Sequence, residues 1–90
     1  MSKKRSVLER MRANPRGQWR IEDVERLCRE VGLDLHAPSR GSHYKVVSVY
    51  LADVVTIPFK RPIKAPYIRT LVSFADAHNA RRQGEEDNDE

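Results

Sequence analysis

The chain has 90 residues, of which 39% are hydrophobic, and its formal net charge at pH 7 is +4. This length and composition predict one small globular domain and exclude a wholly disordered chain. The longest uncharged apolar runs, "VVSVYLA" and "VVTIPF", are far shorter than the roughly 20 residues of a membrane helix. The basic start "MSKKR" leads into charged residues and not into the apolar segment of a signal peptide, so we expect a cytoplasmic protein.

The positive charge is unevenly distributed along the chain. Residues 85–90, "EEDNDE", hold five of the 13 acidic residues, so the rest carries 17 Lys and Arg against eight Asp and Glu, a net charge of +9. Residues 1–20 contain seven Lys and Arg against one Glu. A second basic cluster consists of Lys60, Arg61, Lys64 and Arg69. This distribution favours a polyanionic partner, above all a nucleic acid, over a merely solvated basic surface.

Two helices are predicted in the first third of the chain. Apolar residues on one face favour a short helix over about 4–13, which "NPRGQ" then ends. The strongest helical pattern covers residues 21–31, with Gly32 as its left-handed cap. Cys28 lies on the apolar face of this helix and is expected to be a buried hydrophobe. As the single cysteine it excludes an internal disulfide and a zinc cluster of several cysteines, so no metal or other cofactor is expected.

From residue 33 onward the pattern alternates with the period of two that is typical of strands. We predict strands over 33–37, 43–50 and 54–59. In the second strand one face is expected to hold His43, Lys45, Val47 and Val49, and the other Tyr44, Val46, Ser48 and Tyr50. A final helix is predicted to begin near Pro66, a residue suited to a first helical turn, and to fade around Asn79.

The predicted order is helix, helix, three strands, helix, which indicates an α+β fold. A three-stranded antiparallel sheet can be covered by two helices on one face and solvated on the other. We expect a basic extension with a short helix over 1–20, a domain over 21–80 and a disordered acidic tail over 81–90. The tail either keeps the chain soluble or folds back over the basic face and competes with RNA.

The stretch "RGSHYKV", residues 40–46, is the candidate site. It places a histidine where a turn ends and a strand begins. Glycine permits a positive φ or a close backbone approach, and serine can donate a hydrogen bond to a phosphate oxygen. Considered without further context, such a turn is more often a surface feature than a catalytic one.

The order of the segments resembles the HicA family of bacterial toxins, the small ribonucleases of type II toxin–antitoxin pairs. The matching segments are "IEDVERLCREVGLDL", "RGSHYKV", "VVTIPFKRPIK" and "YIRTLVSFA", which together run from about Ile21 to Ala77. Many relatives place a histidine directly after the proline at the strand end, whereas this chain has Phe59 and Lys60 there. Many also enter the last helix through a Gly-Thr pair, where this chain has Pro66 and Tyr67.

The resemblance implies a fold similar to a double-stranded-RNA-binding domain and an activity that cleaves messenger RNA. The family histidine corresponds to His43, and the residues before it correspond to Gly41 and Ser42. The resemblance also implies a partner similar to a HicB antitoxin, which binds the toxin and covers the histidine.

Elementary chemistry is consistent with this expectation. RNA carries its own nucleophile, the 2′-hydroxyl, so a ribonuclease can work without a metal if it moves protons and neutralises charge on the phosphate. Histidine suits proton transfer at neutral pH, so His43 is the candidate general acid or base. Arg40 and Lys45 are candidate electrostatic supports. The candidate RNA-binding residues are Arg40, Gly41, Ser42, Lys45, Lys60, Arg61 and Lys64.

Other readings stay open. Without a second histidine after Pro58, the chain is alternatively a non-catalytic RNA-binding module of the same fold, or a protein-interaction domain with an acidic partner. His36 on the first strand is expected to be packed or exposed and not catalytic. His78 is expected to provide a favourable charge at the end of the last helix. Trp19 is expected in the core, and the aromatic rings Tyr44 and Tyr50 are expected to pack under the helices.

Overall fold

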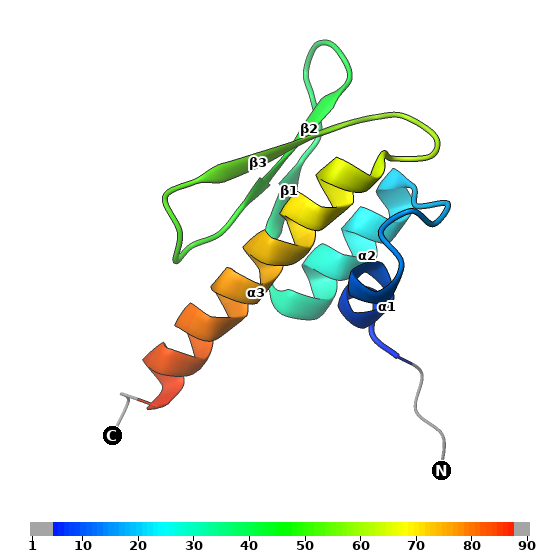
Figure 1. The fold of residues 1–90 in the computed structure, drawn as a ribbon. Helices are drawn as coiled ribbons and strands as arrows, with labels where there is room; N and C mark the ends of the chain where they lie inside the picture. Colours follow the sequence, from blue (N-terminus) through cyan, green and yellow to red (C-terminus); the bar gives the residue numbers. More distant parts are fainter. Residues whose placement is uncertain (1–4, 88–90) are drawn as a thin grey trace.

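The structure of the protein, a computed structural model, describes residues 5–87 (Figure 1). Its elements in chain order are α1 (Val7–Ala13), α2 (Ile21–Val31), β1 (Asp34–His36), β2 (His43–Val47), β3 (Val54–Pro58) and α3 (Ala65–Asp87). The strands form an antiparallel sheet in the order β1-β2-β3. The predicted α+β class with a three-stranded antiparallel sheet is therefore confirmed.

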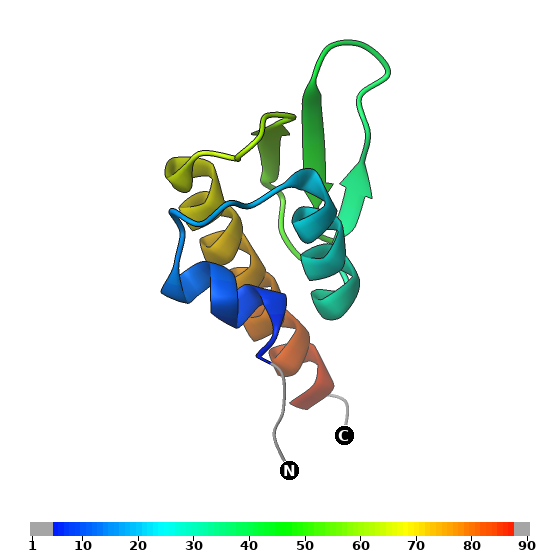
Figure 2. The ribbon, with the colours of Figure 1, turned by 90° about the vertical axis from the view of Figure 1, so that its right-hand side faces the viewer.

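Helices α2 and α3 lie against one face of the sheet, and α1 packs on the helices away from the strands (Figures 1 and 2). The alternation along β2 explains which face is covered. Val46 is completely buried and Tyr44 is half-buried, whereas His43 and Lys45 are exposed. On β3, Val55 and Ile57 are buried against the same helices. Within residues 5–87 no helix is long and apolar enough to cross a membrane.

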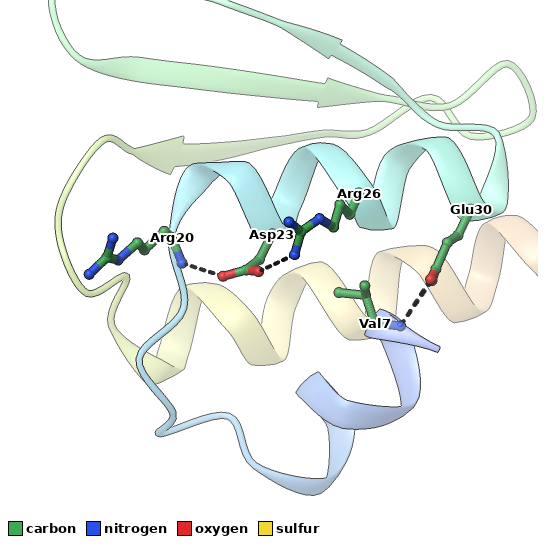
Figure 3. A network of polar contacts seen from close by, with 5 residues as sticks. All are labelled: Val7, Arg20, Asp23, Arg26 and Glu30. Carbon is green, nitrogen blue, oxygen red and sulfur yellow. Dashed lines mark hydrogen bonds and ion pairs between the residues drawn. The ribbon is translucent and has the colours of Figure 1, made fainter. Parts of the chain in front are cut away.

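Helix α1 belongs to the same core as the rest of the chain. Its residues Val7, Leu8 and Met11 are buried, and it contacts both α2 and α3. The Glu30 carboxylate of α2 accepts the Val7 backbone N–H at 3.0 and 3.1 Å, which joins the two helices (Figure 3). The predicted boundary at residue 20 therefore does not divide the packing.

Helix α2 is the element that the sequence defines best. It spans Ile21–Val31 as predicted, and its first turn is held by Asp23, whose carboxylate accepts the Arg20 backbone N–H at 3.0 Å (Figure 3). Gly32 follows with φ of 86°, and the N–H groups of Gly32 and Leu33 both reach the Cys28 carbonyl. This is the predicted left-handed cap, because a residue with a Cβ rarely adopts that conformation.

Helix α3 is longer than predicted. It begins at Ala65, close to the expected start, but continues through Asp87 instead of fading around Asn79. Arg82 accounts for part of this extension, because its guanidinium donates to the Val31 carbonyl at 3.2 Å and so ties this turn of α3 to the end of α2. The predicted disordered tail over 81–90 is therefore helical as far as residue 87, and residues 88–90 lie outside the described chain.

His78 is buried, contrary to the prediction of a favourable charge at a helix terminus. Only 1% of it is exposed. Its Nε2 lies 2.9 Å from the Val31 carbonyl, which can only accept, so Nε2 carries the proton. Its Nδ1 lies 2.7 Å from the Ser48 hydroxyl oxygen, within hydrogen-bond distance, and the same oxygen accepts the Tyr50 N–H at 3.0 Å.

Strand β2 ends at Val47 and not at the predicted residue 50, and a local turn follows it, in which the Ser48 hydroxyl accepts the Tyr50 backbone N–H. The Ser48 side chain stays on the helix side, as the alternation predicts, and there it bonds to His78. Val49 is 75% exposed beyond the strand end. One imidazole thus connects α3 to the end of α2 and to the β2–β3 connection.

Replacing His78 should destabilise the fold markedly. We expect His78→Ala to lower the free energy of unfolding by about 3 kcal/mol, because it leaves a cavity and removes a partner from buried polar groups. Urea denaturation followed by circular dichroism measures the change. His36→Ala is the matched control, since His36 is exposed, and should stay within about 0.5 kcal/mol of the parent chain. Equal effects of the two substitutions would contradict the role assigned to His78.

Cys28 should be nearly unreactive in the native state. Burial, together with the negative charges of Asp34 and Glu25, raises the pKa of the Cys28 thiol from 9.0 to about 11. At pH 8 this lowers the thiolate fraction about 100-fold, and the thiolate is the reactive form. Labelling with a thiol reagent should therefore be at least about 100-fold slower in native protein than in urea. Comparable rates would show that the thiol is accessible and ionised.

Candidate functional site

The turn that precedes β2 holds His43 at the edge of the molecule. Gly41 has φ of 77°, and a Cβ placed on it would meet nothing within 4 Å. The backbone conformation, and not lack of space, therefore requires glycine here. The Ser42 carbonyl accepts the Phe59 N–H at 2.6 Å, which fixes the start of β2 beside the end of β3.

His43 lies on the face of the sheet that no helix covers. It pairs with Pro58 across β2 and β3, and Lys45 pairs with Thr56 two residues further on. His43, Lys45 and Thr56 are all exposed, whereas Tyr44, between the first two, points toward the core. The predicted exposure of His43 and its shared face with Lys45 are both found in the structure.

On one side of His43 is a hollow of about 250 Å³. The residues that line it come from the start of β2, the end of β3, the basic connection and the first turn of α3: Ser42, His43, Pro58, Lys60, Lys64 and Tyr67. Two of its walls are therefore ammonium groups, and none of its lining residues is acidic. Lys60 and Lys64, far from His43 in the sequence, are brought to it as the candidate set requires.

On the other side of His43 is a second hollow, of about 370 Å³. It is lined by the end of β1, the turn and the exposed face of β2: His36, Ala37, Pro38, Ser39, Arg40, His43 and Lys45. Here a guanidinium and an ammonium flank the imidazole, and again no lining residue is acidic. His43 is the residue shared by both hollows.

Arg61, like Gly41, is a candidate RNA-binding residue that lines neither hollow. Its guanidinium lies 5.8 Å from the centre of the Phe59 ring, in the range of a cation–π contact. Phe59 in turn lies 6.2 Å from Tyr44, with the two rings tilted. Phe59 is 44% exposed, so Phe59 and Arg61 form an accessible cation–π pair directly before and after Lys60, which lines the first hollow.

Two residues of this region were not among the candidates. His36 was expected to be packed or exposed, and it is exposed, but it also lines the hollow of His43 and Lys45. Tyr67 enters the first hollow from the first turn of α3. A signal for His36 was available in the sequence. His36 lies near the end of the first predicted strand and His43 at the start of the second, and antiparallel pairing across the turn brings these two strand ends together.

A larger hollow lies elsewhere, at α1 and α2. It measures about 710 Å³ and is lined by Arg5, Val7, Arg10, Arg26 and Glu30. Its one carboxylate is already bonded to the Val7 N–H. This hollow offers positive charge but no group suited to proton transfer at neutral pH, so size does not make it the better candidate.

Comparison with known proteins gives no match: no protein-family model, no curated protein and no solved structure matches the chain. The resemblance to HicA toxins and to double-stranded-RNA-binding domains therefore stays a prediction from the residues quoted above. Within residues 5–87, no three His, Cys, Asp or Glu side chains are grouped so that they could hold a metal ion.

The two glycines Gly41 and Gly84 allow a matched test of the turn. Gly41→Ala should lower the free energy of unfolding by about 1 kcal/mol, because alanine is strained at positive φ. Gly84→Ala, in helix α3 with open space around it, should raise it by about 0.5–1 kcal/mol. Urea titrations of both variants measure the changes. A stabilising Gly41→Ala would contradict the left-handed turn before His43.

Proposed function

We propose that the protein is a ribonuclease that cleaves messenger RNA with His43 as a proton-transfer group, and that it is the toxin of a HicA-like toxin–antitoxin pair. The observation that carries the proposal is the position of His43. It is an exposed imidazole between two hollows whose charged walls, Arg40, Lys45, Lys60 and Lys64, are all cationic. The resemblance of the ordered segments to HicA toxins supplies the identity of the substrate.

The cationic walls suit a polyanion that passes over His43. Single-stranded RNA brings one phosphate per nucleotide, and a phosphate beside the imidazole would have ammonium or guanidinium groups on both sides. Phe59 and Tyr67, which are 44% and 38% exposed, offer rings on which an unpaired base can stack. Ser42 at the start of β2 can donate its hydroxyl to a phosphate oxygen.

The chemistry needs only what RNA and these side chains supply. The 2′-oxygen attacks the adjacent phosphorus, the bond from phosphorus to the 5′-oxygen breaks, and the products are a 2′,3′-cyclic phosphate and a 5′-hydroxyl. The imidazole accepts or donates a proton in this step, and the neighbouring cations neutralise the charge that develops on the phosphate.

The proposed partner follows from the same surface. A protein similar to a HicB antitoxin would block the activity by covering His43, and the cations around the imidazole predict an acidic contact surface on that partner. The proposed location of both proteins is the cytoplasm, where messenger RNA is made and translated.

The test compares the chain with its His43→Ala variant on a single-stranded RNA in the presence of a chelator. We expect the parent to release 2′,3′-cyclic phosphate ends, and His43→Ala to be slower by a factor of about 10²–10⁴, the usual contribution of one proton-transfer group. RNA affinity should change little, because the four flanking cations stay in place. His78→Ala is not a suitable control, since it acts through folding; Asp34→Asn, an exposed change on the same sheet face, is.

Three outcomes would contradict the proposal. Equal cleavage by the parent and His43→Ala would remove His43 from the reaction. Cleavage that stops with the chelator and leaves 5′-phosphate ends would indicate a different chemistry. Tight, salt-sensitive RNA binding without any turnover by the parent would make the protein a non-catalytic RNA-binding module.

A further inference from the structure

A second histidine lies next to His43 on the uncovered face of the sheet. His36, the last residue of β1, pairs directly with Lys45 of β2. Residues that face each other across antiparallel strands project from the same side of the sheet. Because His43 precedes Lys45 by two residues, it projects from that side too. The three side chains therefore lie together on one face of the sheet, with Lys45 next to both histidines: directly across from His36 and two residues along β2 from His43.

The spacing of these three side chains follows from the strand register. His36 and His43 are diagonal neighbours, and such positions are about 7–8 Å apart across a strand pair. At this backbone spacing aromatic and long side chains can reach one another, so the two rings can approach one phosphodiester together, with a hydrogen bond of about 2.8 Å from each imidazole. Both rings line the same hollow of about 370 Å³, together with Arg40 and Lys45.

Breaking an RNA chain calls for two proton transfers on opposite sides of one phosphorus. The proton of the 2′-hydroxyl must leave as the oxygen attacks, and a proton must reach the 5′-oxygen as its bond to phosphorus breaks. A single imidazole can help only one of these events at a time, whereas two imidazoles on either side of the phosphate can help both. Each well-placed group contributes about 10²–10⁴ to the rate.

We propose that His36 is the second catalytic residue of this site, and that His36 and His43 act on one phosphate as a base and acid pair while Lys45 stabilises its charge. This inference rests on the proposed ribonuclease function. One imidazole takes the 2′-hydroxyl proton, the other gives a proton to the departing 5′-oxygen, and the two histidines exchange this proton through water before the next turnover. No other reactant is needed.

The surroundings of His36 are compatible with this role. The charged and titratable groups that face it are Lys45 and His43 from β2 and Arg40 from the turn, with Asp34 two residues before it on the same face of β1. His36 is exposed at the short edge strand, so its ring is free to meet a substrate. This chain has Phe59 and Lys60 where many HicA toxins have a second histidine, directly after the strand-end proline. With His36 the second imidazole comes from β1 and not from the segment after Pro58.

The test measures cleavage of a short RNA across pH by the parent, His36→Asn and His43→Asn. The parent should show a bell-shaped dependence of kcat/KM on pH, and each variant should lose about 10²–10⁴ in kcat and one limb of the bell with little change in KM. A substrate with sulfur in place of the 5′-oxygen needs no acid, because thiolate leaves unprotonated. That substrate should therefore restore the rate of the variant that lacks the general acid, and should not restore the rate of the variant that lacks the general base.

The outcomes separate this inference from the proposed function. If the parent does not cleave RNA, the proposed function fails and the pair fails with it. If the parent cleaves and His43→Asn is inactive while His36→Asn retains the parent rate and both limbs, the function stands and the role of His36 is wrong. Rescue of both variants by the sulfur substrate, or of neither, would also overturn the pair. Asp34→Asn controls for disturbance of β1: it should keep both limbs of the bell and should not lose the factor of about 10²–10⁴ in kcat that each histidine variant loses.

Discussion

One-sided burial of strand β2 is the constraint on which both the core and the candidate site depend. Val46 is wholly buried under α2 and α3, with Val55 and Ile57 of β3 beside it. A slip of one residue in the pairing would turn Lys45 into this core and Val46 into water, and an unpaired ammonium there is far too costly. The hydrophobic face therefore fixes the register. The same register places His43 and Lys45 together in solvent.

The helices cover one face of the sheet, and most of the charged and polar strand residues lie on the other face. On β1 and β2 the polar residues Asp34, His36, His43 and Lys45 face outward, and Val47 at the end of β2 is the apolar residue on this face. The turn and the connection after β3 add Arg40, Lys60 and Lys64 around that face. A site of this kind requires no cleft between domains, since a small sheet with one bare face already gathers side chains from distant parts of the chain.

His78 shows how the framework beneath the site is held. The end of α2 leaves carbonyl groups without partners inside the helix, and the Val31 carbonyl is satisfied from α3 by both His78 and Arg82. Through Ser48 the same imidazole reaches the connection between β2 and β3. The strand that carries His43 at its start is thus anchored at its other end to the helical layer, which limits how far β2 can shift relative to α2 and α3.

Local patterns predicted the elements that depend on nearest neighbours along the chain. The spacing of Ile21, Val24 and Val31 was enough for α2, and the alternation from His43 onward was enough for the two faces of β2. Features that depend on contacts distant in sequence were not predictable in this way. His78 looked like an exposed helix-terminal residue because nothing local reveals that Ser48 and Val31 converge on it. Whether the imidazoles of His36 and His43 share one hollow depends on strand register, which the sequence pattern only implies.

The length of α3 bears on what the acidic end of the chain can do. Lys64 and Tyr67, at the start of this helix, line a hollow with His43, whereas residues 85–87 form its last turn. Twenty-three helical residues separate these ends by about 35 Å. Within the described residues, the acidic end of α3 and the hollow beside His43 therefore lie at opposite ends of one helix.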